Sequence, residues 1–175
     1  SRKTKILILR FSSFGDVTQS LSIPSRLMDL CKMATSEAKS LHKKTVLQSD
    51  NNDNDMEIHW ATRTDMACLL ENHPYINKIW LLDRKQKLVG LWRLIAELRK
   101  QNFTHIYDAH NNLRSLLICL FLLPPLNLSV WLNPPHFIRK SQKRWKRFLL
   151  FKFRINTYEQ PFSGQRDLLE PLQKW

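Results

Sequence analysis

The sequence predicts an α/β fold in which an open parallel sheet is covered by helices on both faces. Strand-like and helix-like segments alternate at short intervals along the 175 residues, which is typical of repeated strand–helix–strand units. The first strand-like run, residues 5–11, is continuously apolar rather than alternating, as expected of a strand buried on both faces. Glycine occurs only three times, which argues against an all-β design with many tight turns.

The first half of the chain contains three predicted strands and two predicted helices. The strands are residues 5–11, 57–61 and 76–82, and the helices are residues 17–32 and 65–72. Pro24 should kink or interrupt the first helix, because proline lacks the amide hydrogen that a helix interior needs. Residues 34–56 include a polar run from Asp50 to Asp55 and predict an exposed, mobile insertion. A calcium loop is the alternative for this run, although it lacks the glycine and closing glutamate of an EF-hand.

The second half continues the alternation and ends in a basic segment. The strands are residues 104–109 and 128–132, and the helices are residues 88–101 and 112–122. Residues 139–153 interleave arginine and lysine with aromatic residues, which predicts a basic amphipathic helix. One more short helix is expected near the end, in residues 155–175.

The net charge of +13 indicates an anionic partner, such as nucleic acid, anionic lipid or a phosphorylated sugar. No acidic residue occurs between Asp108 and Glu159, so the excess belongs mainly to the last third of the chain. Cys31, Cys68 and Cys119 show neither metal nor redox spacing, and we expect buried, inert thiols. No signal peptide is visible, and no apolar run approaches the ~20 residues of a membrane span.

The loop after the first strand is the first candidate site, because ligands of open α/β sheets bind beyond the carboxyl ends of the strands. It contains Ser12, Ser13, Gly15 and Asp16. Gly15 would let the backbone come close to a ligand. Asp16 lies at the start of the following helix, where a carboxylate can cap the helix or act in catalysis. The residues alone leave both interpretations open.

Two further strand ends carry polar side chains. Asp108, His110, Asn111 and Arg114 follow the predicted fourth strand, and Arg63 follows the second. An arginine binds two oxygens of a carboxylate or phosphate at once, so Arg63 and Arg114 are candidates to hold one anionic ligand together. The alternatives are a capped helix with surface polar residues and an exposed loop arginine. The histidines and cysteines show no metal-ligand spacing.

Residues 5–24 resemble the opening of the heptosyltransferases, glycosyltransferase family 9. They read KILILRFSSFGDVTQSLSIP, and the family opens with a strand, R-x-S-S-x-G-D-V, a helix and a proline. Ile58–Trp60 resembles the family's second strand, and His110–Ser115 occupies the place of its ID-x-Q-x-x-x-(R)S segment. Weaker similarity continues to Trp175, outside the 34–56 insertion. Histidine and asparagine stand where the family often has glutamine, which leaves the acceptor's identity open.

The resemblance implies the acceptor-binding, Rossmann-like N-terminal half of a two-domain GT-B enzyme. In such an enzyme Asp16 would be the general base, Ser12, Ser13 and Gly15 would shape its loop, and Arg63, Asp108, His110, Asn111 and Arg114 would bind the acceptor. Transfer would invert the sugar's configuration without a metal or other cofactor. The acceptor would be the acidic lipid A–Kdo core of lipopolysaccharide, and a nucleotide sugar such as ADP-heptose would bind the C-terminal domain.

The family's length is roughly twice that of this chain, so we expect residues 1–154 to form the acceptor domain, residues 155–175 to lead to the hinge, and the donor domain to be absent. Alone, the chain should bind acceptor weakly and transfer no sugar. We expect it in the cytoplasm, peripheral to the inner membrane, with residues 139–153 against anionic lipid. A nucleic-acid-binding module and a degenerate, non-catalytic fragment are the alternatives; no nucleic-acid partner is expected on the first interpretation.

Overall fold

A computed structural model describes residues 3–41, 56–124, 126, 131, 133–140 and 164–174. Its centre is a five-stranded sheet with the order β3-β2-β1-β4-β5, and every neighbouring pair is parallel. The strands are β1 (Thr4–Leu9), β2 (Met56–Arg63), β3 (Lys78–Leu82), β4 (His105–Asp108) and β5 (His136–Arg139). The predicted open parallel sheet is thereby confirmed.

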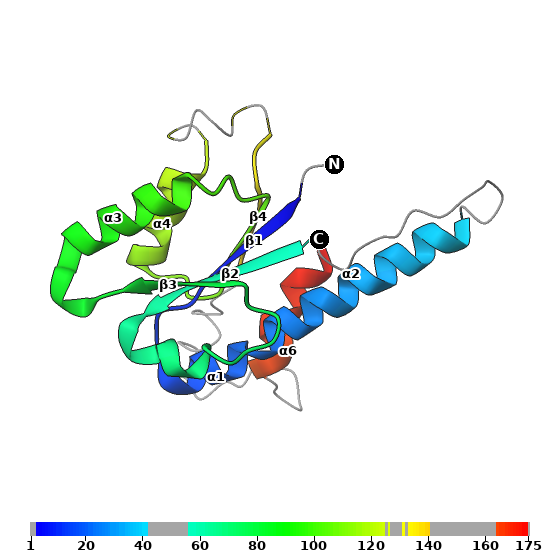
Figure 1. Ribbon diagram of the computed structural model, residues 1–175, viewed down its shortest axis with the longest axis horizontal. Helices are drawn as coiled ribbons and strands as arrows, with labels where there is room; N and C mark the ends of the chain where they lie inside the picture. The colour runs from blue at the N-terminus through cyan, green and yellow to red at the C-terminus, as the bar shows by residue number, and fades with distance from the viewer. Residues whose placement is uncertain are drawn as a thin grey trace, which may run out of the picture.

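Helices cover both faces of this sheet, as predicted (Figure 1). One layer consists of α3 (Lys87–Arg99) and α4 (Leu113–Leu122), and the other of α1 (Phe14–Ser20), α2 (Ser22–Leu41) and α6 (Gly164–Leu169). Short 3₁₀ helices follow some of these elements: η1 (Thr64–Leu69), η2 (Arg84–Gln86) and η4 (Glu170–Lys174). The strand order and the two helical layers make the fold Rossmann-like.

Strand β1 supplies the middle of both hydrophobic cores. Successive side chains of a strand point to opposite faces, so Leu7 and Leu9 pack toward α3 and α4 while Ile6 and Ile8 pack toward α1, α2 and α6. All four are buried. This explains why the run is continuously apolar: neither face of β1 meets water.

The C-terminal segment is attached to the α1–α2 side of the sheet. Leu168 and Leu172 are buried there, and the Tyr107 hydroxyl on β4 donates a hydrogen bond of 2.7 Å to the carbonyl of Leu168. Burial raises the pKa of Tyr107 well above its ordinary value, so this donor keeps its proton. The described end of the chain, residues 164–174, therefore belongs to the packed domain.

The first predicted helix is two helices. Helix α1 ends at Ser20, and α2 begins at Ser22 and continues to Leu41. Pro24 lies in the first turn of α2, where a missing amide hydrogen costs little. The start of the expected insertion is therefore helical, and residues 42–55 lie outside the described residues. The predicted helix 65–72 is instead the shorter η1.

The fifth strand of the described sheet was not predicted from the sequence. It is β5, residues 136–139, and it pairs with β4 in the register Asp108↔Arg139. The basic segment predicted from residue 139 as a helix therefore begins in a strand. Most of the apolar run 128–132 and all of 141–153 lie outside the described residues. The last residues of this pairing, Asp108 and Arg139, form an ion pair that is described below. A pattern of apolar residues in the sequence cannot reveal such a contact.

Two of the three thiols also differ from the prediction. Cys31 and Cys68 are exposed, while Cys119 is buried. Burial raises the pKa of Cys119 to about 12, so this thiol is inert as expected. Cys31 lies on the outer side of α2 and Cys68 on η1, which shows that an apolar neighbourhood in sequence does not place a side chain in the core.

Candidate functional site

The candidate site lies where the chain changes direction in the sheet. From β1 the chain builds β2 and β3 on one side, and then β4 and β5 on the other. The loops after β1 and β4 therefore diverge at their carboxyl ends, and such a point is where ligands bind in open α/β sheets. These two loops contain most of the residues singled out in the sequence.

Asp16 is held in the first loop by Arg10 and Ser13. Its Oδ2 atom lies 2.5 Å from Arg10 Nη2, and it accepts hydrogen bonds from the Ser13 amide at 3.3 Å and the Ser13 hydroxyl at 3.2 Å. The capping interpretation of Asp16 is therefore confirmed, because its carboxylate meets the backbone at the start of α1. Every contact described for this side chain goes to Oδ2, which leaves Oδ1 for a ligand.

The electrostatic balance keeps Asp16 ionised. Burial acts to raise the pKa of its carboxyl, but the charge of Arg10 and the hydrogen bonds from Ser13 outweigh it, so the pKa lies below its usual range. The side chain remains 47% exposed. The site therefore presents an accessible carboxylate at neutral pH.

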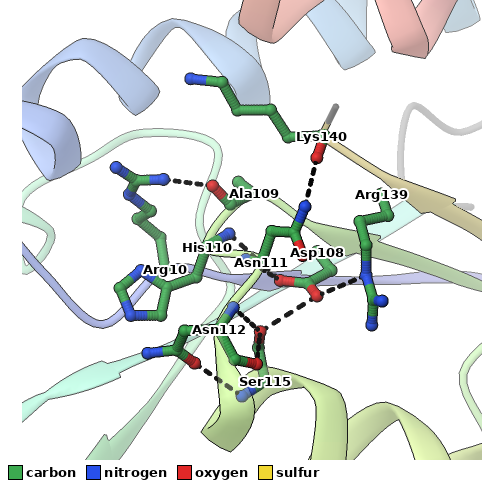
Figure 2. Close-up of polar contacts among 9 residues, drawn as sticks. All are labelled: Arg10, Asp108, Ala109, His110, Asn111, Asn112, Ser115, Arg139 and Lys140. Carbon is green, nitrogen blue, oxygen red and sulfur yellow. Dashed lines mark hydrogen bonds and ion pairs between the residues drawn. The ribbon is translucent and has the colours of Figure 1, made fainter. Parts of the chain in front are cut away.

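Arg10 connects the two loops. It is the residue after β1 and only 6% exposed. Besides the ion pair with Asp16, its Nη1 donates to the carbonyl of Ala109, which follows β4 (Figure 2). Its Nε finds no hydrogen-bond partner in the described part of the chain. A guanidinium that bridges both strand ends fixes Asp16 relative to the second loop.

The carboxylate of Asp108 holds the second loop in place through hydrogen bonds. It is fully buried, and its Oδ1 accepts hydrogen bonds from the amides of His110 (3.1 Å) and Asn111 (2.8 Å). Its Oδ2 accepts from Ser115 Oγ and from Arg139 Nε, each at 3.0 Å (Figure 2). Four donors of the chain itself surround this carboxylate. Asp108 is thus a structural residue, and we no longer expect it to touch an acceptor.

Asn111 and Asn112 shape the turn into α4. Asn111 has φ of 52°, a left-handed conformation that asparagine tolerates better than most residues, and its side-chain amide donates to the carbonyl of Lys140 at 2.8 Å. Asn112 caps α4 by accepting from the Ser115 amide at 3.0 Å. The Asn111 side chain therefore ties the turn to the end of β5, and its part is to shape the loop.

His110 is the side chain of this loop that faces the first loop. It is half-buried, and its ring lies edge-on to Phe11 at 5.8 Å between centroids. Burial, followed by the charge of Arg10, lowers its pKa, and Asp16 and Arg114 also act on it. His110 is therefore neutral at pH 7 and within electrostatic reach of both the Asp16 carboxylate and the Arg114 guanidinium.

A basic hollow lies at the same edge of the sheet. We define it by its lining residues, which are Arg63, Leu82, Asp83, Arg84, Lys87 and Arg114. They come from the ends of β2 and β3, from η2 and from the starts of α3 and α4. Four cations and one acidic side chain line the basic hollow. Asp65 pairs with one of these cations, Arg63, and the remaining surplus of positive charge attracts anionic groups. The helix starts add favourable backbone dipoles.

Arg63 and Arg114 thus line one hollow, which the prediction that they hold one anionic ligand together requires. Arg63 is also held in place: its Nε donates to Asp65 Oδ1 at 2.8 Å. This hydrogen bond raises the pKa of Arg63, and its effect is larger than the opposing effect of burial. Arg114 is exposed and can turn toward a ligand.

Three groups of functional residues escaped the sequence analysis. Arg10 could have been recognised in the sequence, because a cation directly after a buried apolar strand needs an anionic or hydrogen-bonding partner. Arg84 and Lys87 lie in a strand-end loop, but nothing in the sequence relates them to Arg63. Arg139 pairs with Asp108 across 31 residues, a contact that only the sheet creates.

None of the described helices combines the length and apolar character needed to cross a membrane. Within the same residues, no group of three or more histidine, cysteine, aspartate or glutamate side chains is arranged to hold a metal ion.

The chain is similar in sequence to a characterised transferase. It is 27% identical over 119 residues to lipopolysaccharide heptosyltransferase 1 of Campylobacter coli, a match that covers 67% of this chain and 28% of that protein. No protein-family model matches the chain. The resemblance inferred from the opening motif is confirmed by this match together with the structural similarities.

Solved structures share the fold. A family 9 glycosyl transferase from Veillonella parvula DSM 2008 aligns with a TM-score of 0.60 and 11% identity, over 99% of this chain and 42% of that one. The Escherichia coli heptosyltransferase WaaC, solved with ADP, aligns with a TM-score of 0.54 and 14% identity, over 98% of this chain and 47% of that one. The chain spans less than half the length of these relatives. It has the α/β fold of heptosyltransferase-like glycosyltransferases.

Proposed function

We propose that this chain is the acceptor-binding domain of a heptosyltransferase-like glycosyltransferase, with Asp16 as the general base. The observation that carries the proposal is the position of Asp16 at the β1/β4 crossover point, with Oδ2 held by Arg10 and Ser13. Oδ1 is then the oxygen that accepts the proton of the acceptor hydroxyl. A general base needs the correct position first and a suitable pKa second. The buried guanidinium of Arg10 provides the position.

The lowered pKa of Asp16 has a chemical consequence for this proposal. It makes the carboxylate a weak base but keeps it ionised across the physiological range. Proton transfer then takes place as the acceptor oxygen bonds to the donor sugar, because the hydroxyl becomes acidic only in that transition state. The acceptor oxygen displaces the nucleotide from the sugar carbon, the configuration inverts, and Asp16 carries the released proton.

The basic hollow supports an acidic acceptor. An arginine fork binds carboxylate or phosphate oxygens in pairs, and Arg63 and Arg114 line the same hollow. The Nε and Nη2 atoms of Arg63 already donate to both carboxylate oxygens of Asp65, so the exposed Arg114 provides the fork for the ligand and Arg63 adds positive charge. We propose that they bind a carboxylate or phosphate of a glycolipid of the lipid A–Kdo type, while Ser12, Ser13 and Gly15 adjoin the reacting sugar. His110, neutral and within reach of both regions, is proposed to hydrogen-bond the acceptor between them.

The remaining parts of the reaction are proposed for a second domain. The nucleotide-sugar donor, such as ADP-heptose, would bind there, so the chain alone would bind acceptor and transfer no sugar. We further propose that the domain works at the cytoplasmic face of the inner membrane, where an acidic glycolipid acceptor would be met.

Calorimetric titration with the delipidated, Kdo-bearing inner core tests this proposal. We expect saturable binding that weakens about tenfold or more in Arg114→Gln, because one charge-assisted bidentate contact contributes ~1.5–3 kcal/mol. Arg93→Gln is the matched control, since Arg93 lies on α3 but outside the basic hollow. A DNA duplex serves as the polyanion control. Binding of DNA alone, lost in moderate salt, would contradict the proposal and favour a nucleic-acid-binding module.

A further inference from the structure

Helix α4 carries apolar residues on the side that faces away from the sheet. Its inner side is buried through Ile118, Cys119 and Leu122, while Leu113 is 73% exposed and Leu116 and Leu120 are 43% and 47% exposed. A helix of a soluble domain normally places polar residues on its outer side. An apolar outer side is therefore a surface that something covers.

Helix α3 extends this surface. Its first turns expose Leu88 (66%), Val89 (68%) and Trp92 (49%). The two helices form one layer on the same face of the sheet (Figure 1), and the Trp92 ring lies 4.7 Å from that of Phe121 on α4. We call this surface the α3–α4 face and define it by its exposed residues, which are Leu88, Val89, Trp92, Leu113, Leu116 and Leu120.

The charges around the α3–α4 face indicate what covers it. The segment 83–100 and helix α4 together carry seven basic and two acidic residues. Protein–protein interfaces are enriched in aromatic residues and arginine but depleted in lysine and in charge at their centre. Three of the seven cations here are lysines, and a surface that enters a lipid interface combines leucine and tryptophan with a surplus of cations of both kinds. Anionic head groups add ~1 kcal/mol per nearby lysine or arginine. The charge complementarity thus favours an anionic bilayer over a protein partner.

The position of the basic hollow agrees with this occupant. Lys87 and Arg114 line the basic hollow, and each is the immediate sequence neighbour of an apolar residue of the α3–α4 face, Leu88 and Leu113. If these two leucines entered the outer part of a bilayer, their neighbours Lys87 and Arg114 would bring the hollow close to the lipid phosphates. A glycolipid held in the bilayer would present its acidic sugars there.

We infer that the α3–α4 face docks the domain on an anionic membrane, with Leu88, Trp92 and Leu113 entering the interface and the bordering cations contacting lipid phosphates. This inference rests on the proposed function in one respect: the docking would bring the domain to an acceptor that is held in the membrane. The docking itself needs neither acceptor nor donor, so the two can fail separately.

Vesicle flotation tests the docking. We expect the chain to float with vesicles of phosphatidylglycerol and phosphatidylcholine but not with phosphatidylcholine alone. The double variant Leu88→Gln/Leu113→Gln should lose ~tenfold or more in affinity, because two large apolar side chains no longer leave water. Met33→Gln is the matched control: Met33 is 58% exposed but lies on α2, in the opposite layer. Circular dichroism and the thermal midpoint check that all variants fold alike.

Quenching by brominated lipids gives an independent measurement in the unmutated chain. Trp92 should be quenched on docking, and Trp92→Phe should lose that part of the quenching while still floating. Unchanged flotation of the double variant would overturn the inference, as would unaltered quenching in Trp92→Phe. A dimer in solution that the double variant breaks, without vesicle binding, would also overturn it and assign the face to a second copy of the chain. None of these results depends on binding of the soluble acceptor.

Discussion

Asp16 combines a structural contact with a chemically available oxygen, and its partner Arg10 makes this testable. Removing the carboxylate leaves a guanidinium that is 6% exposed without its counter-ion, which is costly. We expect Asp16→Asn to lower the free energy of unfolding by about 1–2 kcal/mol, less than for a fully buried pair because Asp16 is partly exposed and screened.

A double-mutant cycle measures the coupling between the two residues. Asp16→Asn, Arg10→Gln and the combined variant should show a coupling of about 1 kcal/mol in urea unfolding. Ser22→Ala serves as a control, because its hydroxyl is exposed and bonds only within its own turn. Additive effects at Arg10 and Asp16 would show that the guanidinium does not position the carboxylate.

Gly15 gives a prediction in which stability and binding change in opposite directions. It is not at a positive φ, and a Cβ atom there would meet nothing within 4 Å. Because Gly15 lies in α1, Gly15→Ala should raise the free energy of unfolding by about 0.5–1 kcal/mol. The same methyl group would stand in the space proposed for the acceptor, so titration should show weaker binding. Unchanged binding would remove Gly15 from the site.

At the scale of elements, the contact between β4 and β5 depends on Asp108 and Arg139. The carboxylate is fully buried, and the arginine side chain is 30% exposed. Arg139→Met should lower the free energy of unfolding by about 2–3 kcal/mol, because it leaves a buried carboxylate without its cation. Urea unfolding measures this loss. The added substitution Asp108→Asn should recover part of it; no recovery would mean that packing of β5, and not charge, explains the loss.

The elements also show what the sequence could and could not reveal. Strands β1 to β4 and helices α3 and α4 were predictable, because each buries a run or face with the period of its own structure. The position of the break at Leu21 was not, since the prediction placed a kink or interruption at Pro24, which lies instead in the first turn of the second helix. Strand β5 was missed because it is only four residues long and half of them are polar, and its pairing depends on a distant carboxylate.

The candidate site, like the fold, was predictable only in part. Asp16, His110 and Arg114 were found because they follow strand ends, where any parallel sheet places its ligands. Arg10 was missed because it continues an apolar strand and its partners, Asp16 and Ala109, come together only in the folded sheet. The structural contacts of Asp108 were only partly predictable: three of its donors follow it within seven residues, but Arg139 lies 31 residues away and is brought near only by the sheet.

At the scale of the whole molecule, one buried and two half-buried histidines make stability depend on pH. Burial lowers the pKa values of His59, His105 and His110, so the unfolded chain binds more protons than the folded one near and below pH 6.5. Stability is therefore fully present above this pH and is lost as the pH falls through the folded pKa values.

His59 offers the test of this pH dependence. It is 4% exposed, and its Nδ1 accepts a hydrogen bond of 3.2 Å from Trp80 Nε1, which protonation at that nitrogen would break. Lys5 and Lys78 also lower its pKa, whereas Glu57 raises it. Urea unfolding at pH 7.5 and pH 5.5 should show a smaller difference in His59→Gln than in the unmutated chain. An equal difference would exclude His59 as a source of the dependence.

Both proposals for the site require that an acidic sugar acceptor binds across the loops after β1 and β4. Mapping of backbone amide chemical shifts by NMR, during titration with the delipidated Kdo-bearing inner core, tests it most directly. We expect shifts at Ser13 to Asp16, at His110 to Asn112 and around the basic hollow, whereas Thr104 and His105, at the amino end of β4, should not shift. Shifts confined to other surfaces, such as the hollow of Arg26, Arg166, Leu169 and Glu170, or no shifts at saturating acceptor, would contradict it.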